Sequence, residues 1–165
     1  MKIVLRVALL AIVAAVGYWL WTVFFPGPEK LIQRKVTSLA TTVTFNAGDS
    51  PLIRAAKAAS VVDYFTTAAE ISVEMSEMAS HTLSGREEIR ETALAGFTNI
   101  RALNVQFLDV TVRMGADRQI ADVNCTAKVS AGDSKDYELR ELHFQFKKVD
   151  GNWLISRLET LKTLS

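Results

Sequence analysis

Hydrophobic and polar residues alternate regularly in the C-terminal third of the chain. Over 142–146 every second residue is leucine or phenylalanine and the others are histidine and glutamine, which is the period of a strand with one buried face. Asp150-Gly151 tolerates the positive φ angles of a tight turn, and Trp153 and Ile155 then share one face of a returning strand. The pattern predicts an antiparallel hairpin over 138–158. Because an isolated hairpin is only marginally stable, further strands and an apolar layer must cover it.

The same alternation predicts more strands upstream. Residues 71–83 form an expected hairpin, and residues 121–129 alternate without a break. Residues 103–114 form a longer strand in which the hydrophobic side changes at Phe107-Leu108. A one-residue β-bulge would produce that change and would bend the strand, as a curved sheet requires.

Hydrophobic residues spaced three and four apart predict three helices. In the turn before the second helix, Asp49 or Ser50 can cap the helix N-terminus, and Pro51 suits the first helical position. Before the third helix, Ser84–Glu87 has the spacing of a capping box. The order of two helices, a hairpin, a helix and four antiparallel strands predicts an α+β fold. The expected buried stripes are Leu31, Ile32, Val36, Leu39 and Val43; then Leu52, Ala55, Ala59, Val62 and Phe65; then Ile89, Ala93, Phe97 and Ile100.

The N-terminal segment differs from the rest because residues 7–25 carry no charge. About 19 residues at roughly 1.5 Å each give about 28 Å of helix, enough to cross a bilayer. We therefore predict a transmembrane signal anchor over 1–25, a Pro-Gly-Pro linker at 26–28 and a folded domain over 29–165. The alternative is a signal peptide cut after Ala15-Val16-Gly17, which would release a soluble protein.

Basic residues on both sides of the expected span bear on its orientation. Lys2 and Arg6 favour a cytoplasmic N-terminus, whereas Lys30, Arg34 and Lys35 follow the span and oppose it. A short leader before a signal anchor most often leaves the domain outside the cytoplasm. We thus expect a single-pass protein of the inner (cytoplasmic) membrane with a periplasmic or other extracytoplasmic domain. The three later basic residues either contact anionic lipid headgroups, each contributing about 1 kcal/mol of binding energy, or form an ordinary solvated helix face.

Composition argues against several classes of function. The 19 basic and 18 acidic residues leave a net charge of +1, so no basic surface indicates nucleic-acid binding. The sequence has no glycine-rich phosphate loop, His-Glu-x-x-His, Gly-x-Ser-x-Gly or Cys-x-x-Cys, and its two histidines exclude a three-histidine metal site. We expect no cofactor and no metal. The single cysteine, Cys125, excludes an internal disulfide and is expected to be a small buried thiol rather than a nucleophile.

Two segments resemble a known family. Asp150-Gly151-x-Trp153-x-Ile155, after the strand Leu-His-Phe-Gln-Phe, resembles the last hairpin of the nuclear transport factor 2-like (NTF2-like) superfamily, which includes the SnoaL-like, polyketide cyclase-like proteins. The segment Leu83–Ile89 resembles the entry into that family's third helix. The resemblance covers roughly 29–163 and implies a cystatin-like, cone-shaped curved antiparallel sheet packed on three helices, often with an internal pocket and often dimeric. These segments carry no catalytic residues.

Four polar residues are candidates for a site. His143, beside Glu141 on one strand face, is either a general base or a residue of a wet or dimer-contacting face. The resemblance implies that Asp63 and Tyr64 lie where family pockets open, like the acid and hydrogen-bond donor of steroid isomerases, although the motif of those enzymes is missing here. The alternative for this pair is an exposed aspartate beside a packed tyrosine. Asp109 falls at the expected bulge, and a bulge can turn a side chain toward a site.

Together these features predict a membrane-anchored binding or scaffolding domain that is not an enzyme. Its layout is similar to that of type IV secretion scaffold subunits. The expected partners are the membrane, through residues 7–25, and a second copy of the chain or another protein, with a small apolar ligand as a further option. The alternatives are an isomerase, cyclase or dehydratase and a secreted ligand carrier. Titratable groups converging in an apolar cavity would favour the enzyme, whereas a cavity filled by Phe, Met and Leu would disfavour it.

Overall fold

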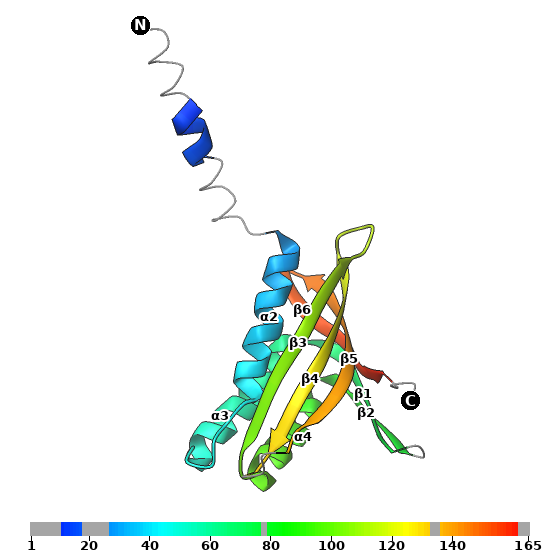
Figure 1. Ribbon diagram of the computed structural model, residues 1–165. Helices are drawn as coiled ribbons and strands as arrows, with labels where there is room; N and C mark the ends of the chain where they lie inside the picture. Colours follow the sequence, from blue (N-terminus) through cyan, green and yellow to red (C-terminus); the bar gives the residue numbers. More distant parts are fainter. Residues whose placement is uncertain (1–10, 18–26, 77–78, 133–135, 162–165) are drawn as a thin grey trace, which may run out of the picture.

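The computed structural model describes residues 11–17, 27–76, 79–132 and 136–161. The folded part is a curved six-stranded sheet with helices on its concave side and at one end (Figure 1). Within the described ranges, no helix has the length and hydropathy needed to cross a membrane. Most of the span expected at 7–25 lies outside the described residues, apart from 11–17, which are helical. The anchor therefore stays a prediction.

The sheet has the order β2-β1-β6-β5-β4-β3. Neighbouring strands are antiparallel except β1 and β6, which run parallel. The predicted α+β class is confirmed. The prediction that all the strands are antiparallel is wrong for β1 and β6. Strands far apart in the sequence carry no local signal of which strand they pair with, so this pairing could not be predicted. The bounds are β1 Phe65–Ser76, β2 Ala79–Ser84, β3 Leu103–Met114, β4 Ile120–Ala131, β5 Glu138–Val149 and β6 Asn152–Leu161.

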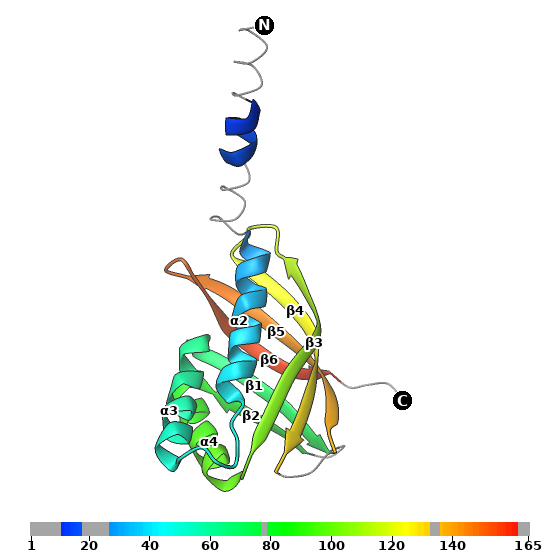
Figure 2. The same ribbon diagram turned by 60° about the vertical axis from the view of Figure 1, so that its left-hand side comes forward.

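The helices of the domain are α2 (Pro28–Val43), α3 (Pro51–Val61), the short 3₁₀ helix η1 (Val62–Tyr64) and α4 (Gly85–Asn99). In Figure 2, α2 lies across the concave side of the sheet, and α3 and α4 pack together at one end. α2 buries Ile32, Val36 and Leu39, as the spacing predicts. Leu31, which was expected in the same stripe, is 41% exposed.

The predicted stripe of the second helix is wrong in phase. α3 buries Ala58 and Val61, whereas Leu52 is 79% exposed and Ala59 is also exposed. The α-helix ends at Val61, and Phe65 is the first residue of β1 rather than part of the helical stripe. Because alanines lie on several sides of this helix, hydrophobic spacing alone does not define the face that packs on α4.

The two predicted helix caps differ in outcome. Ser50 is the N-cap of α3, and its Oγ accepts a hydrogen bond from a first-turn N–H at 3.3 Å, as predicted. The capping box at α4 is displaced: the Ser84 side chain makes no cap hydrogen bond, and Glu88 rather than Glu87 accepts from the Ser84 N–H, at 2.7 Å. Gly85, the first residue of α4, has a φ of +84°, outside the helical region, so the helix begins irregularly.

The C-terminal hairpin and the bulge are both confirmed. Asp150 and Gly151 have φ values of 49° and 82°, the left-handed region that the tight turn between β5 and β6 requires. In β3 the register with β4 shifts after Leu108, and Asp109 has a φ of 53°. Leu108 itself is 40% exposed, so the inward series resumes at Val110 rather than at Leu108.

Candidate functional site

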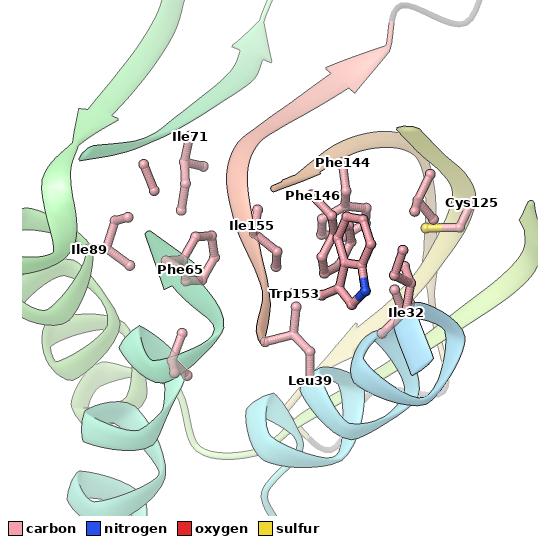
Figure 3. Packing of buried hydrophobic residues seen from close by; sticks show 14 of the residues in the cluster. Ile32, Leu39, Phe65, Ile71, Ile89, Cys125, Phe144, Phe146, Trp153 and Ile155 are labelled. Atoms are coloured by element: carbon pink, nitrogen blue, oxygen red, sulfur yellow. The ribbon is translucent and has the colours of Figure 1, made fainter. Parts of the chain in front are cut away.

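The space between α2 and the concave side of the sheet is filled with hydrophobic side chains. Phe144 and Phe146 of β5 and Trp153 of β6 lie together there, next to Ile32 of α2 (Figure 3). Their exposed fractions are 0, 1 and 4% for the two phenylalanines and the tryptophan. Among the described residues, every buried side chain is hydrophobic and none is polar or charged. No described acid or base is therefore buried in this interior.

The alternation in β4 and β5 explains how the interior is filled. The strand register places Ala121 beside Phe146 and Val123 beside Phe144, so small residues of one strand adjoin large residues of the next. Phe107 of β3 meets Phe144 edge-on, with 5.6 Å between the ring centroids. Edge-to-face aromatic pairs at this distance are favourable beyond the area that they bury. Side chains of neighbouring strands thus fill the space on the concave side of the sheet by packing against one another.

Cys125 lies in the same inward series of β4 and is 5% exposed. Burial raises the pKa of its thiol from 9.0 to about 12. Since the thiolate is the reactive form, the thiol is inert near neutral pH. The expectation of a small buried thiol is confirmed.

Asp63 and Tyr64 lie in a groove between α2, α3 and η1. The groove has a volume of about 480 Å³ and is also lined by Leu31, Arg34 and Lys35 of α2. These α2 residues come from the side of the helix that does not face the sheet, so the groove is separate from the hydrophobic interior. The sequence placed the aspartate and tyrosine together but gave no indication that basic residues of the first helix would face them.

The phenol of Tyr64 is held in a chain of hydrogen bonds to α2. Thr42 Oγ1 donates to the Ser38 carbonyl at 3.0 Å and therefore accepts from the Tyr64 hydroxyl, also at 3.0 Å. Ser38 Oγ, at 2.7 Å, then donates to the Tyr64 oxygen. Lys35 Nζ lies 5.8 Å from the ring centroid. The Tyr64 proton is thus directed into α2, and the side chain fastens η1 to that helix rather than pointing an acid at the groove.

His143 lies on the outer face of the sheet, opposite the hydrophobic interior. Its Nδ1 is 2.8 Å from Asn124 Oδ1, and its Nε2 is 3.5 Å from Asp122 Oδ1. The predicted partner Glu141 does not make these contacts, because the register sets Asn124 directly across from His143 while Glu141 lies two residues along its own strand. The clean alternation of β4 could have placed Asn124 and Asp122 on this face, but only the register shows the contact.

Asp109 is exposed at the bulge of β3, where its carbonyl accepts a hydrogen bond from Thr111 Oγ1 at 3.4 Å. Its side chain is not brought to the groove that contains Asp63 and Tyr64. The four candidate residues therefore do not form one site. In the described part of the chain, no group of three His, Cys, Asp or Glu side chains is placed to hold a metal ion.

The domain can be compared with known proteins. A family model for the SnoaL-like domain matches residues 31–158. No curated protein matches the chain. Among solved structures, an NTF2-like protein of unknown function from Pseudomonas putida KT2440 has a TM-score of 0.65 at 8% identity, covering 83% of this chain and 87% of that one.

Two further structures carry names of enzymes. A proposed scytalone dehydratase from Novosphingobium aromaticivorans DSM 12444 has a TM-score of 0.63 at 16% identity, covering 82% of this chain and 83% of that one. A proposed NTF2-like dehydratase from Streptomyces avermitilis has a TM-score of 0.62 at 15% identity, covering 82% and 96%. At such identities these structures share a fold with this chain, and no activity follows from that. The family match spans most of the domain: the chain belongs to the SnoaL-like domain family and has the NTF2-like, cystatin-like fold.

Proposed function

We propose that this chain is a membrane-anchored binding domain without catalytic activity. The observation that carries the proposal is the filled interior, where Phe144, Phe146 and Trp153 occupy the concave side of the sheet and no described polar side chain is buried. A catalytic pocket needs titratable or polar groups that converge around the substrate. Here Asp63 lines an outer groove and His143 lies on the outer face of the sheet.

The groove between α2, α3 and η1 is the surface that we propose for a protein partner. Leu31 contributes an exposed hydrophobic side chain, and Arg34 and Asp63 supply opposite charges. Neither of these two charges forms an ion pair with another described residue. A hydrophobic centre with a polar, charged rim is the usual composition of a protein interface. A second copy of the chain is the alternative occupant.

An enzyme of the dehydratase kind is the alternative function. Its support lies in the names of two structural neighbours, a proposed scytalone dehydratase and a proposed dehydratase. It requires a pocket that opens into the concave side of the sheet. The secreted carrier requires such a pocket too, together with removal of the N-terminal segment.

Trp153 allows entry of a ligand into the interior to be measured. With Trp19 and Trp21 replaced by phenylalanine, it is the one tryptophan left of the three in the chain. We expect its emission in the full chain, held in detergent micelles, to stay unchanged when cyclohexanol or cyclohexanone is added. The reason is that the indole is 4% exposed and enclosed by packed side chains. The measurement is a fluorescence titration that records emission wavelength and intensity.

A Phe144→Ala variant of the same protein is the positive control. Deleting a buried ring leaves a hydrophobic cavity, and such cavities take up small apolar molecules. A saturable emission change in this variant and none in its parent supports the proposal. A saturable change in the parent over the same concentrations would show an open pocket and would favour the enzyme or the carrier.

Thiol labelling tests the anchor and its orientation in one experiment. Ala116 is exposed in the turn between β3 and β4, and Cys125 is buried, so an Ala116→Cys variant has one reactive thiol. Spheroplasts are treated with a membrane-impermeant maleimide, and the mass of the variant is measured after recovery from the membrane fraction. We expect the mass of the full chain plus one label. The unsubstituted chain should stay unlabelled. A full-length unlabelled variant would place the domain in the cytoplasm, and a product lacking the N-terminal residues would favour the carrier.

A further inference from the structure

A hollow on the outer face of the sheet forms where β1 and β6 lose register. Phe65 pairs with Ile155 and Glu70 pairs with Arg157, so β1 uses more residues than β6 over the same stretch. The ladder is interrupted at Thr66–Ala69. A hollow of about 520 Å³ lies at this gap, between the start of β1, the β5–β6 hairpin and the beginning of α4.

Two cationic side chains line this hollow. Arg86, partly buried, donates from Nε to the Phe65 carbonyl at 2.7 Å, which orients the guanidinium and leaves both Nη groups without a partner among the described residues. Lys147 is exposed and forms no ion pair with a described acid. Asp150 is the one acidic residue of the lining. Positive charge and unused N–H donors are therefore in excess here.

Apart from Ser156, whose hydroxyl donates to the Gln145 carbonyl at 3.1 Å, the rest of the lining is of two kinds. One kind can donate further hydrogen bonds through hydroxyl or amide groups, and no described residue pairs with these side chains. The other kind provides a partly exposed hydrophobic surface. The donors are Thr66, Thr67 and Asn152, and the hydrophobic residues are Ala68, Val149 and Leu154.

We propose that this hollow binds a small organic carboxylate, with the carboxylate on Arg86 and Lys147 and the apolar body against Ala68, Val149 and Leu154. The free Nη edge of a guanidinium matches the two oxygens of a carboxylate, and the ammonium of Lys147 adds a second charge. The hydrophobic surface distinguishes such a ligand from an inorganic anion, which would gain nothing from it. The site is separate from the filled interior and from the groove beside Tyr64, and the inference does not depend on the function proposed for that groove.

The test is an NMR titration of the ¹⁵N-labelled full chain in uncharged detergent micelles, with sodium benzoate, sodium acetate and inorganic phosphate at constant ionic strength. Saturable shifts are expected at the amides of residues 66–68 and 147–156. Benzoate should have a dissociation constant at least ten times smaller than acetate or phosphate. Phosphate binding as tightly as benzoate, or benzoate shifts that never saturate, would overturn the proposal.

Matched variants locate the site. Lys147→Gln should weaken benzoate binding at least five-fold, whereas Lys148→Gln removes the same charge from the next residue, which does not line the hollow, and should leave the affinity unchanged. Arg86→Lys keeps the charge but loses the planar fork, so it should also weaken binding. Because Arg86 also holds the start of β1, the Lys147 and Lys148 pair decides the outcome. Equal effects of these two variants would contradict the assignment.

Discussion

Replacing Phe144 with alanine is expected to lower the free energy of unfolding by about 3–5 kcal/mol. The ring is 0% exposed, with its centroid 5.6 Å from that of Phe107 and 6.2 Å from that of Phe146. The variant loses both the transfer energy of the ring and the contacts around the cavity that remains. Since small domains are stable by only about 5–15 kcal/mol, the loss is a large fraction of the total. Urea unfolding followed by circular dichroism measures it.

Two further variants separate burial from aromatic character. Phe144→Leu retains most of the volume and should cost about 1–2 kcal/mol. Tyr137→Ala removes an aromatic ring that is 55% exposed and lies under Lys128, with 4.2 Å from Nζ to the centroid. It should cost no more than about 1 kcal/mol. A loss below about 1 kcal/mol for Phe144→Ala would mean that the interior is not packed as described.

Raising the pH above 9 is expected to destabilise the domain through Cys125. Burial raises the pKa of this thiol from 9.0 to about 12. The unfolded chain therefore loses the thiol proton first, and the free energy of unfolding falls as the pH rises between the two values. The free energy of unfolding falls by about 1.4 kcal/mol per pH unit once the pH exceeds 9, so the loss between pH 8.5 and 10.5 is about 2 kcal/mol. Urea unfolding at a series of pH values gives the slope.

The comparison with Cys125→Ala isolates the thiol. All other titratable groups are the same in both proteins, so the difference between the two stability curves reports the cysteine alone. The variant is expected to be less stable at pH 8.5 because it has a small cavity, but its stability should decline less steeply above pH 9. Parallel curves would contradict a pKa raised by burial.

The strands were predictable where the signal is local. β4 alternates strictly, and the turn at Asp150-Gly151 combines residues that accept positive φ, so neither needed knowledge of the rest of the fold. The bulge at Asp109 was also predictable, because a change of hydrophobic side along one strand has few physical causes. What alternation cannot show is the neighbour of each strand. The contact of His143 with Asn124 depends on the β4–β5 register and was missed for this reason.

Other features had no signal in the sequence. Residues Thr66–Ala68, which follow the first residue of β1, do not alternate between hydrophobic and polar, so the sequence predicts a later start for this strand. The hollow near Arg86 exists because two strands far apart in the chain differ in register, which no local pattern can reveal. Tyr64 was recognised as a candidate, but its hydroxyl contacts with Ser38 and Thr42 require α2 to be in place.

The parallel pairing of β1 with β6 determines when the domain can become complete. Phe65 pairs with Ile155 within the sheet, and α2 packs against β6 from the concave side, so early and late segments of the domain are in direct contact. Contacts between such distant segments are made only after the entropy of closing a long loop has been lost. During synthesis, the hydrophobic side of α2 therefore stays uncovered on its β6 side until the last strand has emerged. The nascent chain passes through a long interval in which it is open to aggregation or to capture by a chaperone.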